Sequence, residues 1–585
     1  MAEAFQLTAA EHGERTAIRT KDDEFTATWS EYAERVRRIA AGLAALGVGR
    51  GDTVGLMLVN RPEFHFADTG AMHLGATPFS IYNTSTVEQI EYVIGDAANR
   101  VLFTEAAFLD TVLEASAGAP ALEHVVVVDG EARDGTISLA ELEAMGEEEF
   151  DFEAAWRGIE SDDLVTLIYT SGTTGPPKGV QLTHGSLLAA ARSFNELIPF
   201  PEGGRLISWL PMAHVAERNV THYMPMVHGV TTTCCPDPRQ VAAYLTEVRP
   251  TWFFAVPRIW EKLKAAMEIG IGAEPDESRK KAVEWALDVG RRKVEAEQDG
   301  GTVPVELAEE YAQADALVLS KLRERIGLDE VEAVNVGAAP TPREVIEFFH
   351  AIGVPLAELW GLSESCAAGT CNPPERIKIG TVGPPAPGIE LKLAGDGEVL
   401  LRGSILMTGY RNDPEKTAEA IDAEGWLHTG DVGELDEDGY LRIVDRKKEL
   451  IINSAGKNMS PANIEAKIKA SSPLIGQVCV VGDNRPYNVA LVVLDPDAAP
   501  AFAARNGIEA SAPEELATQP AVLAEVSAGV ERGNARLARV EQVKKFKLLS
   551  TDWQPGGVEL TPTMKLKRRP IEHRYAEEIE GLYAE

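Results

Sequence analysis

A short loop near residue 170 gathers hydroxyl groups, glycines and a lysine, and this composition suits phosphate binding. The run is Tyr169-Thr-Ser-Gly-Thr-Thr-Gly-Pro-Pro-Lys-Gly-Val180. Backbone N–H groups and hydroxyls of such a loop can point at phosphate oxygens, and glycines let the backbone approach a ligand closely. It is not a Walker A loop, because no Gly-Lys-Ser/Thr follows at the required spacing. We expect a buried strand at residues 164–168 before the loop and a helix after it.

This loop resembles the phosphate-binding signature of the adenylate-forming superfamily, which includes acyl-CoA synthetases, luciferases and peptide-synthetase adenylation domains. Further matches follow in that family's order and cover nearly the whole chain. The chain therefore resembles an AMP-forming acyl-CoA synthetase of the long-chain fatty acid type. The resemblance implies that seven residues of the loop contact ATP or AMP: Thr170, Ser171, Gly172, Thr173, Thr174, Gly175 and Lys178.

A second motif, Trp360-Gly-Leu-Ser-Glu364, resembles the Tyr-Gly-x-Thr-Glu element of the superfamily. A flat indole ring suits a purine face, and Mg²⁺ prefers a carboxylate together with phosphate oxygens. The resemblance implies that Trp360 stacks on adenine, that Ser363 meets the α-phosphate, and that Glu364 holds Mg²⁺ and acts in catalysis. Three small residues, from this motif and from an upstream match, would complete the nucleotide pocket: Gly361, Gly337 and Ala338.

Two later segments resemble the ribose-binding and hinge elements of the superfamily. In Trp426-Leu-His-Thr-Gly-Asp431, the carboxylate of Asp431 would accept hydrogen bonds from both ribose hydroxyls, which suits a group that only accepts. The polar run Asp445-Arg-Lys-Lys448 resembles the hinge between the two domains. The resemblance implies a nucleotide contact for Arg446 and the pivot at Lys448.

The coenzyme A and catalytic-lysine motifs lie closer to the C-terminus. Ser454-Ala-Gly-Lys-Asn458 matches the loop that the family places beside the pantetheine tunnel, which implies coenzyme A contacts for Gly456 and Lys457. Leu560-Thr-Pro-Thr-Met-Lys-Leu-Lys567 resembles the catalytic-lysine segment, with Lys565 at the matching position. Since another lysine follows at Lys567, the register of this match stays open.

Two segments resemble long-chain synthetases in the region of the acyl group. Leu210-Pro-Met-Ala-His214 resembles the acyl-pocket segment, which implies that His214 lines that pocket. Some long-chain members carry a gating tryptophan shortly afterwards, where this chain has Glu217 and Arg218. The segment Val256-Pro-Arg-Ile-Trp-Glu-Lys262 also resembles long-chain synthetases, but its residue types alone give it no physical role.

The implied reaction consumes a medium-to-long-chain fatty acid, ATP and coenzyme A, with Mg²⁺ as cofactor. It gives acyl-CoA, AMP and pyrophosphate through an acyl-AMP intermediate. Three alternatives stay open: a fatty acyl-AMP ligase that loads a carrier protein, a non-catalytic adenylate-binding regulator, and a luciferase-type oxygenase. Adding coenzyme A and assaying for a thioester separates the first two alternatives from the synthetase.

The elements that must position these residues indicate an α/β protein. Apolar strand-like runs alternate with helical patterns through the first 450 residues, which predicts layered, largely buried sheets. Residues 262–330 are rich in Ala, Glu, Lys and Arg, and we expect a helical insertion there. We expect an N-terminal AMP-binding domain at 1–447 and a small, mobile α+β domain at 448–585.

Composition limits the partners. The chain has 585 residues and a formal net charge of -35, which argues against nucleic-acid binding driven by phosphate attraction and against broad adhesion to anionic lipid. Its five cysteines form no Cys-x-x-Cys motif, and reduced thiols are expected. With neither a signal peptide nor a long apolar run visible, we expect a cytoplasmic enzyme with at most peripheral membrane contact. The oligomeric state is not readable from the sequence.

Overall fold

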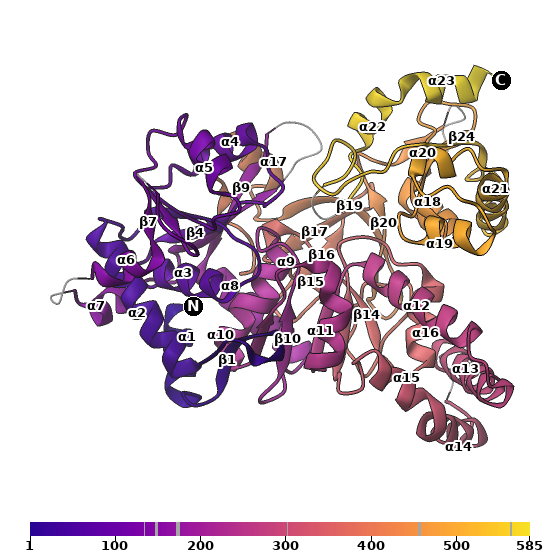
Figure 1. Cartoon of the computed structure of the whole chain (residues 1–585), viewed down its shortest axis with the longest axis horizontal. Helices are drawn as coiled ribbons and strands as arrows, with labels where there is room; N and C mark the ends of the chain where they lie inside the picture. The colour runs from indigo at the N-terminus through magenta and orange to yellow at the C-terminus, as the bar shows by residue number, and fades with distance from the viewer. Residues whose placement is uncertain are drawn as a thin grey trace.

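The chain folds into a large N-terminal body and a smaller C-terminal body, which lies at the upper right in Figure 1. The computed structural model describes residues 1–133, 135–146, 150–170, 176–300, 302–453, 458–561 and 564–584. Both bodies mix helices and sheets, so the expected α/β class with a large and a small domain is observed. No helix within the described ranges has the length and apolar character needed to cross a membrane.

An eight-stranded sheet forms one layer of the large domain, in the order β18-β9-β8-β4-β3-β5-β6-β7. Its strands are β3 (Thr53–Met57), β4 (Thr77–Ser80), β5 (Val101–Thr104), β6 (His124–Val127), β7 (Ile137–Ser138), β8 (Leu164–Thr170), β9 (Lys178–Thr183) and β18 (Gly409–Tyr410). Every residue of β3, β4 and β5 is buried, as expected for parallel strands covered on both faces. The helices between and beside these strands are α2 (Trp29–Ala45), α3 (Pro62–Met72), α4 (Val87–Ala97), α5 (Leu109–Ser116), α6 (Leu139–Ala144), α7 (Phe152–Arg157) and α8 (His184–Leu197).

A second layer is a four-stranded sheet with the strand order β12-β13-β14-β15. It carries the predicted nucleotide-binding motifs. These strands are β12 (Trp252–Ala255), β13 (Ala333–Val336), β14 (Leu356–Gly361) and β15 (Gly369–Cys371). The first three run parallel, so their carboxyl ends meet at one edge. A neighbouring sheet contains β1 (Thr16–Thr20), β2 (Thr26–Thr28), β10 (Arg205–Ser208) and β11 (Thr231–Cys234). Between β10 and β11 the chain forms α9 (Val215–Arg218), the π-helical turn η2 (Asn219–Tyr223) and α10 (Met224–His228).

The region expected to be a helical insertion consists of consecutive helices. These are α12 (Pro257–Gly272), α13 (Glu277–Gln298), α14 (Val305–Ala314), the π-helical turn η4 (Asp315–Leu319) and α15 (Ser320–Arg325). They lie at the lower right of Figure 1, away from the first sheet. Helix α16 (Arg343–Ala351) packs against both α12 and α13 and joins the insertion to the second layer.

The remaining strands of the large domain form an antiparallel sheet in the order β16-β17-β19-β20. They are β16 (Glu390–Leu393), β17 (Glu398–Arg402), β19 (Leu427–Leu435) and β20 (Leu441–Arg446). In the small domain, β23 (Ile475–Val481), β24 (Asn488–Leu494) and β25 (Val543–Leu548) form a three-stranded sheet. The helices of this domain are α18 (Pro461–Lys469), α19 (Ala498–Arg505), α20 (Pro513–Leu516), α21 (Pro520–Asn534), α22 (Arg568–Arg574) and α23 (Ala576–Ala584).

The phosphate-loop region departs from the expected strand–loop–helix order. Residues 178–183 form β9, which pairs antiparallel with β8, and the helix α8 begins only at His184. Val180 and Leu182 are fully buried at alternating positions, which is the period of a strand. The side chain of Thr183 accepts a hydrogen bond from the backbone N–H of Ser186, and this cap fixes where α8 begins. The glycine-rich loop therefore joins two strands of a hairpin. The expected helix is observed as α8, but the strand β9 between the loop and this helix was not predicted.

Candidate active site

The ends of the phosphate hairpin place Lys178 opposite Thr170, since these two residues are paired across β8 and β9. The predicted contacts Ser171–Gly175 lie outside the described residues. The ammonium Nζ of Lys178 lies 4.5 Å from the centre of the Tyr410 ring. Tyr410 comes from β18, which adds to the hairpin by pairing with β9.

Tyr410 connects this lysine to the predicted metal ligand. Its hydroxyl donates a hydrogen bond of 2.8 Å to Oε1 of Glu364, which lies in the short 3₁₀ turn η5 (Ser363–Ser365) together with Ser363. Burial raises the pKa of Tyr410, and the negative charge of Glu364 raises it further, so the phenol stays protonated as a donor. Sequence reasoning missed Tyr410, because only the pairing of β18 with β9 brings it to the site.

Small residues at the strand ends are required by close packing. A Cβ on Gly361 would lie 2.3 Å from the carbonyl oxygen of Ala367. A Cβ on Gly337 would lie 3.0 Å from Cδ1 of Leu359. Ala338 follows with φ 70, a left-handed conformation that is uncommon for a residue with a side chain. The ends of β13 and β14 are thus held in a strained, tightly packed arrangement of the kind that occurs at ligand sites.

Trp360 and Arg446 hold the two oxygens of the predicted ribose-binding carboxylate. The indole Nε1 of Trp360 donates to Oδ2 of Asp431 at 2.9 Å, and Nε of Arg446 lies 2.9 Å from Oδ1. Asp431 and Arg446 are also register partners across β19 and β20. Burial raises the pKa of Asp431, and the charge of Arg446 acts in the opposite direction. The structure therefore brings the predicted adenine, ribose and nucleotide contacts into one cluster.

Lys565 reaches this cluster from the small domain. Its carbonyl accepts a hydrogen bond of 2.8 Å from the N–H of Thr561. Its charge acts on Asp431, Glu364 and His214. Lys565 is exposed as a residue, and the surrounding protein displaces part of the water near its ammonium group, which lowers its pKa. The nearby charge of Arg446 lowers the pKa further.

The alternative lysine, Lys567, contacts its own domain. Its Nζ donates to the carbonyl of Gly557 at 2.8 Å, and its backbone N–H donates to the carbonyl of Glu559 at 2.7 Å. Of the two lysines, the structure thus brings Lys565 to the cleft.

His214 lies at the N-terminus of α9, where its Nδ1 accepts a hydrogen bond of 3.3 Å from the N–H of Ala216. Burial lowers its pKa to about 3, and the charge of Lys565 lowers it as well. The ring is therefore neutral at physiological pH. His214 is therefore near enough to Lys565 to feel its charge, and it is not itself a charged contact.

The residues after His214 are fixed inside the large domain. Arg218 forms an ion pair with Asp68, and its Nη1 donates to Oγ of Ser80 at 2.7 Å. Both Arg218 and Asp68 are fully buried. Glu217 accepts hydrogen bonds from the N–H of Trp209 at 2.9 Å and from the hydroxyl of Thr221 at 2.8 Å. Buried polar contacts therefore hold Glu217 and Arg218 in place. This is the stretch where the resemblance places a gating tryptophan in some long-chain synthetases.

A small cavity of about 20 Å³ lies between two elements of the large domain. On one side it is lined by Ala216 of α9 and Met224 of α10, and on the other by Trp252, Phe254 and Leu359 of β12 and β14. Sequence reasoning assigned no residue of this lining.

The predicted hinge lies where β20 ends and the small domain begins. The N–H groups of Glu449 and Leu450 both donate to the carbonyl of Arg446, which forms a turn with Lys448 exposed on it. Asp445 is buried beside it and accepts a hydrogen bond of 2.5 Å from Oγ of Ser460, at the start of α18. The predicted coenzyme A contacts Gly456 and Lys457 lie outside the described residues.

Ion pairs between the two domains give the segment at residues 256–262 a physical role. Arg258 pairs with Asp495, and Lys262 pairs with Asp497 at 2.6 Å. Further pairs between the domains join Glu261 to Lys469 at 3.3 Å and Glu344 to Arg536 at 2.7 Å. We call these four contacts the interdomain ion pairs. They connect α12 and α16 to the small domain in the orientation that brings Lys565 into the cleft.

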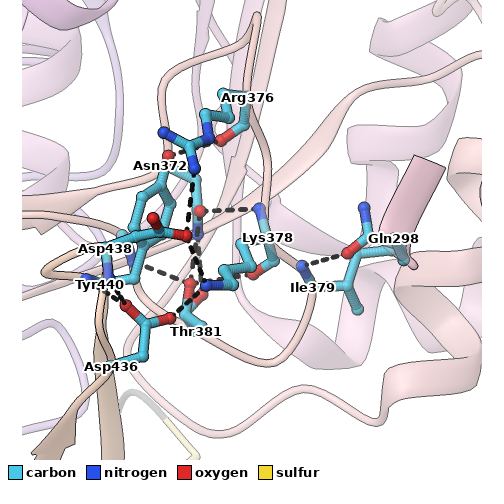
Figure 2. A network of polar contacts seen from close by, with 10 residues as sticks. Gln298, Asn372, Arg376, Lys378, Ile379, Thr381, Asp436, Asp438 and Tyr440 are labelled. Atoms are coloured by element: carbon cyan, nitrogen blue, oxygen red, sulfur yellow. Dashed lines mark hydrogen bonds and ion pairs between the residues drawn. The ribbon is translucent and has the colours of Figure 1, made fainter. Parts of the chain in front are cut away.

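A polar network behind the site, shown in Figure 2, was also not foreseen. Gln298, at the end of α13, accepts a hydrogen bond of 2.9 Å from the N–H of Ile379. Lys378 in the same loop pairs with Asp438 at 3.1 Å, in the hairpin between β19 and β20. Asn372 donates to the carbonyl of Glu358, two residues before Trp360. The network thus connects the helical insertion to both strands that carry the nucleotide cluster.

The match to a known family follows from comparison with other proteins. The AMP-binding enzyme family matches residues 5–411, and the AMP-binding enzyme C-terminal domain matches residues 448–585. The chain belongs to the AMP-binding enzyme family. This confirms the resemblance to the adenylate-forming superfamily.

Individual proteins agree with this assignment. The FadD11 protein of Mycobacterium tuberculosis is 51% identical over 77% of this chain and 79% of its own length. The long-chain-fatty-acid–CoA ligase FadD15 of Mycobacterium bovis is 36% identical over 95% of this chain and 92% of its own. The crystal structure of the anthranilate CoA ligase AuaEII superposes with a TM-score of 0.76 at 20% identity, covering 99% of this chain and 98% of that one. This structural likeness supports the fold.

Proposed function

We propose that this protein is an AMP-forming fatty acyl-CoA synthetase that activates medium-to-long-chain fatty acids. It uses ATP to make acyl-AMP and then transfers the acyl group to coenzyme A. The observation that carries the proposal is the position of Lys565, whose charge acts on Glu364, Asp431 and His214 from the other domain. Polar groups suited to a nucleotide therefore meet at one lysine. The similarity to the long-chain-fatty-acid–CoA ligase FadD15 supports a fatty acid as the substrate.

In the first half-reaction, a carboxylate oxygen of the fatty acid attacks the α-phosphorus of ATP. The new phosphorus–oxygen bond gives acyl-AMP, and the bond to the β-phosphate oxygen breaks to release pyrophosphate. Two anionic groups must approach each other, so the protein's task is positioning and charge neutralisation. Lys565 would bridge the two anions, Trp360 would stack on adenine, and Asp431 would bind the ribose hydroxyls.

In the second half-reaction, the coenzyme A thiol loses its proton and attacks the acyl carbonyl, and AMP leaves. We place the domain boundary between residues 447 and 448 and the pivot at Lys448, in the exposed turn after β20. Rotation there would withdraw Lys565 and present the loop containing Gly456 and Lys457. The interdomain ion pairs would have to break during this rotation, because each joins one domain to the other.

Glu364 fits a Mg²⁺ ion, because Mg²⁺ is usually held by one or two carboxylates together with substrate phosphates. When bound, the ion would neutralise phosphate charge. Tyr410 would orient the carboxylate through its hydrogen bond to Oε1. Replacing Glu364 by alanine is expected to abolish Mg²⁺-dependent pyrophosphate exchange. Exchange that persists at the wild-type Mg²⁺ requirement would exclude Glu364 as the ligand.

We further propose coenzyme A as the acceptor, a cytoplasmic location and at most peripheral contact with membranes. The net charge of -35 disfavours adhesion to anionic lipid. Membrane association that resists high salt and carbonate would contradict this.

The direct test assays the two half-reactions with purified protein. Pyrophosphate exchange with ATP should depend on a fatty acid, and subsequent addition of coenzyme A should give the thioester. Exchange without a thioester, but with transfer to a carrier protein, would favour the fatty acyl-AMP ligase. No exchange with any fatty acid would overturn the proposed function.

A further inference from the structure

The segment that carries Lys565 is anchored to the small domain on its C-terminal side. Leu566 forms an antiparallel β-bridge with Leu560, which is fully buried in the apolar cluster of this domain. Arg568 is the third residue after Lys565 and begins α22. Because only two residues separate them, whatever holds the side chain of Arg568 also limits where Lys565 can lie.

The guanidinium of Arg568 contacts two glutamates. Its Nη1 and Nη2 donate to the two carboxylate oxygens of Glu465 at 2.6 and 2.7 Å, and its Nε donates to Oε2 of Glu449 at 3.1 Å. The side chain of Arg568 is 14% exposed, and those of Glu465 and Glu449 are 10% and 24% exposed. A bidentate pair that is shielded from water in this way is stronger and more directional than an ion pair on the surface.

Glu465 connects Arg568 to the core of the small domain. It lies on α18, which packs against β23. Its Oε1 also accepts a hydrogen bond of 2.7 Å from the N–H of Val480 in β23. The bidentate pair therefore fixes Arg568 relative to the central sheet of the domain.

Glu449 connects Arg568 to the proposed pivot. It directly follows Lys448, and its N–H donates to the carbonyl of Arg446 at 2.9 Å. The side chain of Arg446 in turn contacts Asp431 of the nucleotide cluster at 2.9 Å. A series of contacts thus runs from Asp431 through the hinge turn to Arg568.

The shape of the guanidinium suits this place better than a charge alone would. Its five N–H donors lie in a fixed planar fork, so it can hold Glu465 with two nitrogens and still offer Nε to Glu449. A lysine ammonium is a compact charge on a flexible stem and does not reproduce this geometry. Arg568 can therefore hold the orientation of the segment that contains Lys565.

We propose that Arg568 is a positioning residue for adenylation, which holds Lys565 at the α-phosphate through its contacts with Glu465 and Glu449. This inference rests on the proposed function. Arg568 acts through Lys565 rather than on the substrate. Since rotation of the small domain withdraws Lys565 before thioester formation, the contribution of Arg568 is confined to the first half-reaction.

The test measures both half-reactions of Arg568→Met, which keeps a long side chain but has no donor. A misplacement of about 1 Å can cost about 100-fold, so kcat for pyrophosphate exchange should fall about 10- to 100-fold. The KM values for ATP and fatty acid, and thioester formation from supplied acyl-AMP, should each change less than about threefold. Arg568→Lys should recover little of the loss, because the ammonium cannot hold both glutamates in the same geometry.

Arg569→Met is the matched control. Arg569 is the next residue of α22 and is exposed. Both half-reactions should stay near wild type in this variant. A loss of exchange equal to that of Arg568→Met would mean that any disturbance of α22 has this effect, and it would overturn the inference.

Glu449→Ala tests the inference if Arg568→Met does not fold, since it removes the contact beside the pivot and leaves the bidentate pair with Glu465 in place. It should lower pyrophosphate exchange about tenfold and spare thioester formation. Adding either substitution to Lys565→Ala should lower single-turnover acyl-AMP formation by no more than about twofold, because no lysine is left to position.

Three results would overturn the inference. They are an equal loss of both half-reactions in folded Arg568→Met, unchanged exchange in Glu449→Ala, and a large further loss when either substitution is added to Lys565→Ala. Wild-type protein that activates no fatty acid at all would instead contradict the proposed function.

Discussion

The indole Nε1 of Trp360 donates a hydrogen bond of 2.9 Å to Oδ2 of Asp431. The superfamily element that this motif resembles has a tyrosine where this chain has Trp360. In this chain the ring proposed to stack on adenine also orients the carboxylate proposed to bind ribose. Arg446 holds the second oxygen of Asp431, so the carboxylate is fixed from both sides.

This contact predicts that Trp360→Phe weakens nucleotide binding more than loss of stacking area explains. A hydrogen bond to a charged group typically contributes about 1.5–3 kcal/mol, and part of this is lost when the donor is removed. We expect the KM for ATP to rise about tenfold with a smaller change in the KM for fatty acid. Asp431→Asn combined with Trp360→Phe should lose less than the sum of the two single substitutions. Full additivity of the two substitutions would mean that the contact does not matter.

The interdomain ion pairs lead to a second prediction. The side chains of Arg258 and Asp495 are 19% and 7% exposed, so this pair is better shielded than a typical surface pair. Arg258→Met should loosen the orientation that brings Lys565 into the cleft and lower pyrophosphate exchange about tenfold. Thioester formation from supplied acyl-AMP should not fall.

Arg292→Met is the matched control for Arg258. Arg292 lies on α13 and pairs at 2.7 Å with Glu310 of α14. Both partners belong to the large domain, so its loss removes an ion pair without removing an interdomain one. Equal effects of the two substitutions on pyrophosphate exchange would contradict the proposed role of the interdomain ion pairs.

Glu217 predicts a pH dependence of stability. Burial raises its pKa from 4.5 to about 7, so the folded protein binds this proton more tightly than the unfolded chain. Its contribution to stability is therefore complete below the unfolded pKa of 4.5 and is lost as the pH rises through about 7. The glutamine of the Glu217→Gln variant cannot ionise, so this variant does not lose stability in this way as the pH rises. Between about pH 5 and pH 8 the free energy of unfolding should fall by about 2–3 kcal/mol more in wild type than in the variant.

The measurement is denaturant unfolding at both pH values, with Glu514→Gln as a control. Glu514 is an exposed glutamate of α20. The control should follow the wild-type pH dependence. A Glu217→Gln variant that does so too would show that Glu217 is ionised in the folded protein at neutral pH.

Sequence motifs predicted much of the candidate site. The rest depends on pairing between segments that are distant in the sequence. Trp360, Asp431 and Lys565 could be proposed from sequence because each lies in a segment whose residue types resemble a known element. The contact between Tyr410 and Glu364 could not, since it depends on β18 adding to the edge of the hairpin. The strand at 178–183 was missed because Lys178 and Gly179 obscure its short alternation of buried residues.

The interdomain ion pairs had no sequence signal of their own. Arg258 lies in a segment whose resemblance was visible but whose partner, Asp495, lies in the other domain.

The central claim is that Lys565 acts in adenylation alone, and the two half-reactions of Lys565→Ala test it most directly. Loss of one preorganised charge contact in a transition state costs about 3–4 kcal/mol, so adenylation should fall by several orders of magnitude while thioester formation from supplied acyl-AMP survives. Lys448→Pro should do the reverse, because proline restricts the turn that must rotate, and Lys567→Ala should leave adenylation near wild type. Equal loss of both half-reactions in Lys565→Ala, or a larger adenylation loss in Lys567→Ala, would contradict the account.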